Sequence, residues 1–423
     1  MDIDYDLVIA GGSIAGAALG FAAQRAGARV LIVEPETAFR DRVRGEMLHP
    51  WGVAEAQRLG LSEVLERAPV HAAHYWDTYI GGQRIERRDL AQTTSSRLTV
   101  FNAHHPELQA ALLAAARDVG VEVRTGAKVV RIEPGSPAVV ELARDGDHAR
   151  VTARLAVIAD GRQSQLRAQL GIAVTGERMP MLISGVLLEG VSCDSEAVGM
   201  FLPAKFGELA LVLRLARDRV RLYFVARRDP DGQDGSVQSQ PGHESDLPSD
   251  RSAQRRGYTG AAQLPAMLRR CMEVGVPESW LARARAIGPL ATFETTCWSL
   301  RDLALPPGVA LIGDAAGNVD PVFGCGQSLA LRDVRHLVDA AGACRGDWQL
   351  AAAKYHHLRH AYHAALLRCE SWMSRILYAP SPRGDAIRAA ALPRLDELGI
   401  DLVGAGPDSP TDDATEARLF AGI

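Results

Sequence analysis

The chain has 423 residues, of which 47% are hydrophobic and 23% charged, and its formal net charge is −4. This length exceeds what one hydrophobic core usually organises, so two packed domains that share a ligand cleft are expected. The slightly acidic balance gives no positive field that would gather nucleic acid or anionic lipid, so we expect a small-molecule partner and no nucleic acid.

Neither the start of the chain nor its apolar segments predict export or membrane insertion. Residues 1–6 are acidic, where a secretory signal would be basic. No apolar stretch reaches the roughly 20 residues needed to cross a bilayer, so no integral membrane segment is expected. The six cysteines form no Cys-x-x-Cys pair, which favours free thiols in a reducing compartment over a disulfide framework or a zinc site. We therefore predict a cytoplasmic protein without a metal site.

The first elements in chain order predict a β-α-β unit. A short apolar run covers residues 5–10, a helix of small residues follows over 15–26, and a second apolar run covers 29–34. A further helix is predicted over 106–119. The strands predicted around it, joined by Gly, Pro and Asp turns, are 121–124, 127–132, 138–143 and 149–159. This alternation indicates an α/β domain.

From about residue 181 the pattern changes to successive apolar strands. They predict an antiparallel sheet inserted into the first domain, with strands over 182–188, 198–202, 209–213 and 219–226. Residues 229–260 are dominated by Ser, Gln, Gly, Asp and Pro, and we predict a flexible insertion there because such a segment cannot bury a core. A strand over 308–312, a long helix over 327–342 and further helices to about residue 398 complete the chain.

The first motif is the glycine-rich turn GGSIAG at residues 11–16, between a predicted strand and a predicted helix. Both flanking conditions of a dinucleotide-binding fingerprint are met. Gly11 permits the tight turn, Gly16 lets the helix approach the strand, and the helix N-terminus offers N–H groups to a pyrophosphate. Glu34 ends the second strand, where its carboxylate can accept hydrogen bonds from ribose hydroxyls. The alternative is a tight turn in a domain that binds no nucleotide.

Two further motifs each follow a predicted strand. The second is VIADGRQSQLR at residues 157–167, and the third is LIGDAAG at 311–317, followed by Pro321 and by GCG at 324–326. Taken singly, each could be an ordinary strand-to-turn junction. Taken together, in this order and at these intervals, the three motifs resemble the p-hydroxybenzoate hydroxylase-type flavoproteins, the class A flavoprotein monooxygenases.

The resemblance and the predicted elements together give an α/β fold with a Rossmann-like FAD-binding domain, an inserted antiparallel-sheet substrate domain and C-terminal helices. The FAD-binding domain is predicted over residues 1–175 and 288–345, with 70–105 as candidates to line the substrate site. The substrate domain is predicted over 176–287. A C-terminal helical region and tail would occupy 346–423.

In the family, the first motif binds the ADP half of FAD, the second supports the flavin, and the third holds the ribityl chain through its aspartate. The residues that the resemblance assigns to cofactor binding are Gly11, Ser13, Ile14, Ala15, Gly16, Glu34, Arg44, His105, Asp160, Gly161, Asp314, Pro321, Gly324, Gly326 and Gln327. The chain departs from the family pattern in three places: Ser13 replaces a glycine, His105 replaces an arginine, and Gly317 stands where many members have histidine.

A helix that begins near residues 324–327 would direct its positive N-terminal end at the flavin pyrimidine, where negative charge accumulates on reduction. Cys325 lies within this turn. Covalent attachment to the flavin is conceivable there, but a small buried thiol is the favoured interpretation.

Three histidines, His356, His360 and His363, fall on one stripe of a predicted helix. No carboxylate or cysteine completes a metal set, and the neighbouring His357 and Arg359 favour a solvated basic face. We therefore predict that these imidazoles are polar surface residues. Candidates to line the substrate pocket are His49, Trp51, Tyr75 and His104. No catalytic residue is predicted.

The resemblance implies an FAD-dependent, NAD(P)H-driven monooxygenase that inserts one oxygen atom of O2 into a small organic substrate through a flavin hydroperoxide. NADPH or NADH would bind transiently, which agrees with the single nucleotide fingerprint in the sequence. One alternative is a flavin reductase or dehydrogenase of the same fold that transfers hydride without oxygen insertion. Another is a flavin-binding module without turnover.

Overall fold

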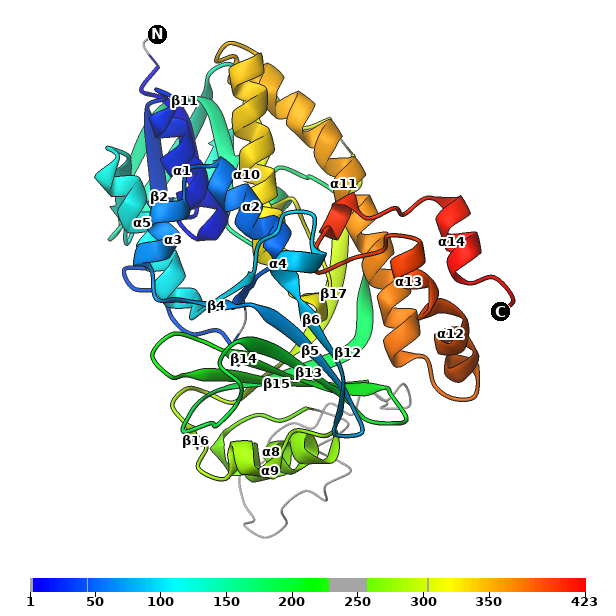
Figure 1. The fold of residues 1–423 in the computed structure, drawn as a ribbon. Helices are drawn as coiled ribbons and strands as arrows, with labels where there is room; N and C mark the ends of the chain where they lie inside the picture. The colour runs from blue at the N-terminus through cyan, green and yellow to red at the C-terminus, as the bar shows by residue number, and fades with distance from the viewer. Residues whose placement is uncertain (1–2, 44, 228–256, 303) are drawn as a thin grey trace, which may run out of the picture.

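The structure is a computed structural model that describes residues 3–43, 45–227, 257–302 and 304–423. Two large sheets organise the described part, and long helices run beside them (Figure 1). The insertion predicted over 229–260 lies almost wholly outside the described residues.

The first large sheet has seven strands in the order β8-β2-β1-β11-β10-β9, with β18 paired to β11. The pairs β8·β2, β2·β1, β1·β11 and β11·β18 are parallel. The bounds are β1 (Tyr5–Ala10), β2 (Val30–Glu34), β8 (Glu122–Thr125), β9 (Lys128–Glu133), β10 (Ala138–Arg144), β11 (Asp147–Ile158) and β18 (Val309–Leu311). The predicted α/β domain is therefore confirmed.

One face of this sheet is covered by α1 (Ile14–Arg25), α5 (His105–Asp118) and α10 (Gly326–Ala343), which share a hydrophobic core with it. The predicted first helix begins and ends one residue earlier than expected. Its small residues allow close packing, because a Cβ at Gly16 would lie 1.9 Å from the carbonyl oxygen of Gly11. The turn before α1 is therefore held tightly against the helix.

The second large sheet has nine strands in the order β19-β17-β12-β15-β14-β13-β5-β6, with β16 paired to β12. The four predicted apolar strands are found as β12 (Val174–Glu189), β13 (Ala197–Leu202), β14 (Glu208–Arg214) and β15 (Val220–Arg227). Their pairing is antiparallel, apart from the parallel pair β13·β5. The remaining strands are β5 (Tyr75–Ile80), β6 (Gln83–Asp89), β16 (Arg285–Ala286), β17 (Ala291–Leu300) and β19 (Gly317–Asn318).

Strand pairing thus differs from the expected division of the sequence in three places. Residues 75–89, 291–300 and 317–318, which were expected in the FAD-binding domain, form strands of the nine-stranded sheet. The domain boundaries themselves stay a prediction.

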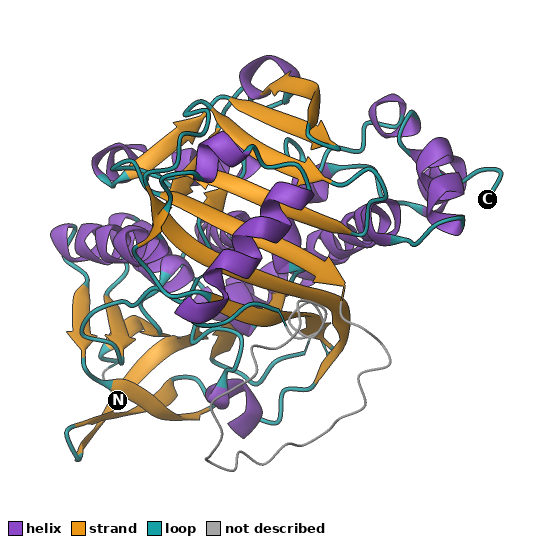
Figure 2. Cartoon of the chain, turned by 90° about the horizontal axis from the view of Figure 1, so that it is seen from below, coloured by secondary structure: helices purple, strands orange, loops and turns teal. Residues whose placement is uncertain are grey.

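Helices cover the side of this sheet that faces away from the α/β domain (Figure 1). The helices α8 (Leu264–Glu273) and α9 (Glu278–Leu281) pack there against a core that includes Leu222 and Phe224. Figure 2, seen from below, shows a helix crossing in front of the strands. The opposite face carries Ile183, Leu211 and Val225. This second face turns toward the α/β domain and is free to form part of a site.

The other elements connect or flank the two sheets. They are β3 (Met47–Leu48), α2 (Pro50–Arg58), α3 (Ser62–Arg67), β4 (Val70–Ala73), α4 (Leu90–Thr93), β7 (Val100–Ala103), α6 (Gln165–Gln169), α11 (Trp348–Tyr378), α12 (Arg383–Ala391), α13 (Arg394–Glu397) and α14 (Asp413–Leu419). The longest, α11, packs along α10 and reaches from one sheet toward the other (Figure 1). Within the described ranges, no helix is long and apolar enough to span a bilayer.

Candidate cofactor and substrate site

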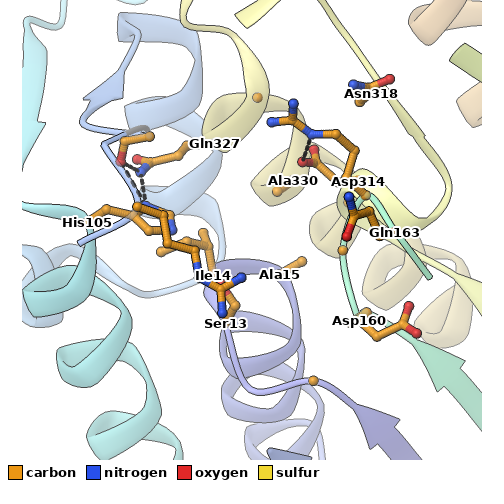
Figure 3. Close-up of a pocket in the computed structure, with 18 of the residues that line it drawn as sticks. Ser13, Ile14, Ala15, His105, Asp160, Gln163, Asp314, Asn318, Gln327 and Ala330 are labelled. Atoms are coloured by element: carbon orange, nitrogen blue, oxygen red, sulfur yellow. Dashed lines mark hydrogen bonds and ion pairs between the residues drawn. The ribbon is translucent and has the colours of Figure 1, made fainter. Parts of the chain in front are cut away.

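A pocket of about 1030 Å³ opens where the carboxyl ends of β1, β2, β11 and β18 face the nine-stranded sheet. All three predicted motifs contribute to its wall (Figure 3). The predicted cofactor-binding residues that line it are Gly11, Ser13, Ile14, Ala15, Glu34, His105, Asp160, Gly161, Asp314, Pro321, Gly324, Gly326 and Gln327. Gly16 packs against the turn instead of lining the pocket, and Arg44 lies outside the described residues. The roles of these residues stay a prediction.

The first-motif turn has the geometry expected of a nucleotide cradle. Gly11 has a φ of +109°, and a Cβ there would lie 2.4 Å from the carbonyl oxygen of Ala159, so only glycine fits. The Ser13 hydroxyl accepts a hydrogen bond of 2.7 Å from the side chain of Gln109. Gln109 also lines the pocket and was not predicted, although it lies one helical turn after His105 on α5.

Glu34 is buried, and both of its carboxylate oxygens are oriented by backbone donors. Oε2 accepts from the N–H of Gly12 at 2.6 Å, and Oε1 accepts from the N–H of Glu36 at 2.9 Å. Burial raises the pKa of the Glu34 carboxyl, although these two hydrogen bonds oppose the shift. Each oxygen retains acceptor capacity, so the group is held ready to receive donors from a ligand.

Glu34→Ala is therefore expected to weaken FAD binding by about 1.5 to 3 kcal/mol, the usual loss for hydrogen bonds to a charged acceptor. Fluorescence titration of the apoprotein with FAD measures this as roughly a 10- to 160-fold rise in Kd. Glu36→Ala is the comparison within the same wall, because it removes a neighbouring carboxylate that lines the pocket and its ion pair with Arg42 but keeps the backbone donor to Glu34. Equal affinities for Glu34→Ala and the wild type would contradict the role of this carboxylate.

The second and third motifs are tied to each other at the pocket wall. Gly161 follows β11 with a φ of +82°. Arg167 donates a hydrogen bond of 3.2 Å to the carbonyl oxygen of Ala315. The Asp314 carboxylate lies 3.7 Å from Nε of Arg162, an unpredicted lining residue, and points into the pocket with Asp160 nearby (Figure 3). The second and third motifs, which are far apart in the sequence, therefore lie side by side in the structure.

His105 and Gln327 meet at the other end of the pocket (Figure 3). Nδ1 of His105 lies 2.8 Å from the carbonyl oxygen of Gly45 and 3.0 Å from Nε2 of Gln327. The Gln327 amide also donates to Gly45. These contacts connect α5, the loop before β3 and the start of α10, so they fix the N-terminus of α10 at the pocket.

Cys325 is fully buried and does not line the pocket, which confirms the expectation of a small buried thiol. Its Sγ lies 3.6 Å from the carbonyl oxygen of Phe323. Burial raises the pKa of this thiol well above its usual range, so it stays protonated. Gly326 and Gln327, at the start of α10, line the pocket instead.

The nine-stranded sheet supplies a largely apolar wall to the same pocket. Its lining residues are Ile183, Leu211, Leu213, Tyr223, Val225, Phe293, Glu294, Thr296 and Asn318. The four residues suggested from the sequence, His49, Trp51, Tyr75 and His104, are not part of the wall, so that prediction is wrong. His49 directly precedes α2, and Trp51 lies on that helix with its side chain in a buried hydrophobic cluster.

A buried charge cluster that the sequence did not predict supports this wall. Arg221, on β15, donates to Glu46 at 3.0 Å and to both carboxylate oxygens of Asp41 at 2.8 Å. The Tyr223 hydroxyl also donates to Glu46. Burial raises the pKa of Asp41, but a contact with His104 and the Arg221 charge together outweigh burial and hold the pKa below its usual range. An arginine within an apolar strand was the only signal of this cluster in the sequence.

A buried acidic pair, Asp320 and Glu370, lies next to the turn that carries Pro321. Asp320 is fully buried, and its Oδ1 accepts from the N–H of Val322 at 3.1 Å. Its own N–H donates to Glu370 at 2.9 Å. Burial raises the pKa of Asp320 to about 6, and burial together with the Asp320 charge raises the pKa of Glu370 well above its usual range. The folded protein therefore takes up protons here at mildly acidic pH.

Asp320→Asn is expected to gain stability relative to the wild type as pH rises. Because the pKa of Asp320 is raised from 3.8 to about 6, the folded wild type holds this proton more tightly than the unfolded chain. The wild type therefore loses up to about 3 kcal/mol in total as the pH rises from below 4 to above 6, a loss that the uncharged amide avoids. Urea unfolding at pH 4.5, 5.5 and 7 measures the difference. Asp145→Asn removes a carboxylate that is 88% exposed and so controls for the loss of one surface charge, and parallel pH profiles for both variants would refute the prediction.

The predicted surface stripe on α11 is wrong for three of its residues. His356, Arg359 and His363 are buried, with exposed fractions of 4%, 3% and 2%. His357 and His360 are exposed, as expected. No cluster of histidine, cysteine or acidic residues within the described ranges has the geometry of a metal site.

Residues 4–246, more than half of the chain, match the family model described as FAD binding domain. The FAD-dependent monooxygenase OpS4 of Beauveria bassiana is 32% identical over 168 residues, which are 39% of each chain. Squalene monooxygenase of Mus musculus is 23% identical over 344 residues, covering 78% of this chain and 54% of the relative. Menaquinone reductase of Mycobacterium tuberculosis is 29% identical over 171 residues, covering 40% and 41%. The chain thus spans about half or less of the length of these relatives.

Among solved structures, p-nitrophenol 4-monooxygenase PnpA from Pseudomonas putida DLL-E4 superposes with a TM-score of 0.73. The match covers all of both chains at 19% identity. At this identity the likeness concerns the fold.

Proposed function

The chain belongs to the FAD binding domain family of class A FAD-dependent monooxygenases, and from this premise we propose that it inserts one oxygen atom of O2 into a small organic substrate. The observation that carries the proposal is the continuity of the pocket. Its wall runs from the turn at Gly11 past Asp314 to the apolar side chains of the nine-stranded sheet. A cofactor and a substrate could therefore meet in one cavity.

The residues present fit an FAD molecule. The starts of two helices, α1 at Ile14 and α10 at Gly326, open onto the pocket and offer backbone N–H donors to anionic or electron-rich groups. Glu34 provides an oriented acceptor at the first of these starts. Asp314 provides an acceptor between the two, where the resemblance implies the ribityl chain. Bound FAD supplies the two-electron redox chemistry and the reaction with O2.

The wall at the substrate end is largely apolar. Ile183, Leu211 and Phe293 present apolar surface, and Tyr223 is anchored by its hydrogen bond to Glu46. An apolar wall of this kind would limit the access of water to reactive species. We propose NADPH or NADH as a transient reductant, supported by the single nucleotide fingerprint in the sequence. The free thiols of all six cysteines support a reducing compartment such as the cytoplasm.

The test starts from purified protein, which should be yellow and hold about one FAD per chain. NADH and NADPH oxidation, O2 consumption and peroxide release are then measured with a panel of organic compounds. A compound that raises NAD(P)H and O2 consumption without a matching rise in peroxide, and gains one oxygen atom by mass spectrometry, is the expected result. A colourless preparation that cannot be reconstituted with FAD would overturn the proposal.

A second candidate is a reductase that transfers hydride without oxygen insertion, and the similarity to menaquinone reductase favours keeping it. The two are separated by repeating the assay without O2. A reductase continues to convert its substrate under anaerobic conditions, whereas a monooxygenase stops after flavin reduction. Protein that binds FAD but shows neither activity would be a flavin-binding module.

A further inference from the structure

One face of α11 contacts the third motif through a row of buried polar side chains. His356, Arg359, His363 and Glu370 lie on this face, and each is at most 4% exposed. All four contact the segment 311–320, which contains the third motif. We call this row the polar seam.

The ends of the segment are fixed by hydrogen bonds from its backbone to the polar seam. The N–H of Leu311 donates to Nε2 of His356 at 3.2 Å. Burial, followed by the Arg359 charge, lowers the pKa of His356 to about 3, so the imidazole is neutral and can accept this bond. At the other end, the N–H of Asp320 donates to Glu370 at 2.9 Å.

Arg359 holds the middle of the segment. Its guanidinium donates to the carbonyl oxygens of Ala316 at 2.9 Å and Gly317 at 3.0 Å. Its Nε donates at 3.0 Å to Oδ2 of Asp333, on α10, and that oxygen also accepts from the N–H of Gly313 at 2.8 Å. The two members of one buried ion pair therefore hydrogen-bond to the turn 313–317, Asp333 at its start and Arg359 at its end.

The ion pair has little freedom to move. The second oxygen of Asp333 accepts from the Tyr362 hydroxyl at 2.6 Å. Arg359 and Asp333 are 3% and 0% exposed. Asp314 is the second residue of this turn; its side chain is 39% exposed and lines the pocket. The backbone of the turn is thus fixed by residues on the side away from the pocket, while the Asp314 carboxylate faces the pocket.

We propose that the Arg359–Asp333 pair positions the flavin by fixing the turn 313–317, and with it the Asp314 carboxylate, relative to the pocket. Neither residue lines the pocket, so both act through the turn. The inference rests on the FAD binding in the proposed function but not on oxygen transfer. A planar guanidinium suits this task because three different nitrogens of its fixed fork reach two carbonyls and a carboxylate at once, whereas an ammonium carries all its donors on a single nitrogen.

The test compares Arg359→Met with Arg332→Met. Arg332 is the adjacent residue to Asp333 on α10 and is 5% exposed. It pairs with Glu55 at 2.9 Å and with Asp408, and none of its hydrogen bonds or ion pairs in the described structure is to the turn. Both substitutions break a buried ion pair, so both are expected to lower the thermal midpoint. Only Arg359→Met should disturb the flavin.

Four quantities are measured for each FAD-loaded variant: the thermal midpoint, the Kd for FAD, the visible circular dichroism of the flavin and its reduction potential. Arg359→Met is expected to raise the Kd for FAD at least about tenfold and to change both flavin signals. Arg332→Met should keep the flavin signals and a Kd within about twofold of the wild type. Equal flavin effects in the two variants would mean that the pair is merely structural and would overturn the proposal.

Arg359→Lys keeps the positive charge beside Asp333 and covers the case in which Arg359→Met does not fold. It is expected to fold, to bind FAD more weakly than the wild type and to show an altered flavin dichroism, because one ammonium cannot replace the fork. Flavin signals and affinity identical to those of the wild type would overturn the positioning role. A wild type that binds FAD but oxygenates nothing would instead count against the proposed function alone.

Discussion

Asp314→Ala is expected to lower coupled turnover by about a hundredfold, the usual consequence of displacing a reacting group by roughly 1 Å. The reason is the position of Asp314, on the turn after β18, with its carboxylate in the pocket. Among the described residues, the one ion pair of its side chain is with Arg162, at 3.7 Å. Removing the carboxylate should therefore leave the protein nearly as stable as the wild type, to within about 0.5 kcal/mol.

The prediction for Asp314→Ala is tested by three measurements: the thermal midpoint, the flavin absorbance and the peroxide yield per NAD(P)H oxidised. The expected pattern is an almost unchanged midpoint with altered flavin absorbance and more peroxide. Asp314→Asn is the matched control, since its amide oxygen can still accept a hydrogen bond. The opposite pattern, a destabilised protein with unchanged turnover per flavin, would show that Asp314 only supports its turn.

Gly16→Ala is expected to abolish FAD retention during purification, with at least about a hundredfold loss of affinity. The added Cβ would lie 1.9 Å from the carbonyl oxygen of Gly11 and 3.2 Å from the Ile9 side chain. The first contact is with backbone, so the helix or the turn must move, and overpacking of this kind costs about 1 to 3 kcal/mol or more. The movement would disrupt the turn that the resemblance assigns to the ADP half.

Gly342→Ala provides the control, because it also lies in a helix but a Cβ there meets no atom within 4 Å. It should be neutral or stabilise the protein by up to about 1 kcal/mol, owing to the better helix propensity of alanine. Flavin absorbance per chain and the thermal midpoint are measured for both variants. Full FAD content in Gly16→Ala would show that the turn tolerates displacement.

The sequence was most informative where local pattern and neighbouring strands determine structure. The glycine turn before α1 and the position of Glu34 at the end of β2 follow from a β-α-β pattern alone. Asp160 and Asp314 come together because they follow β11 and β18, which are adjacent parallel strands. Their convergence on one pocket could therefore be expected from the order of the motifs.

The polar seam could not be recognised in the same way. A stripe of polar side chains at helical spacing has the same sequence pattern whether it faces water or a buried backbone. For His356, Arg359 and His363 the outcome was decided by the unpaired peptide groups of the third motif, which need partners once they are buried. Similarly, the ion pairs of Arg221 with Asp41 and Glu46 join residues about 180 positions apart, beyond the reach of local patterns.

The nine-stranded sheet has a practical consequence for engineering. Its strands come from three separate parts of the chain, residues 75–89, 174–227 and 285–318. In a chimera that exchanges only the central part, the incoming β13 and β12 would have to pair with the β5 and β17 of the recipient protein instead of their own. Transplanting the substrate wall from a homologue therefore requires all three parts at once, and selection for new substrates is better served by point changes at inward-facing positions such as Leu211 and Phe293.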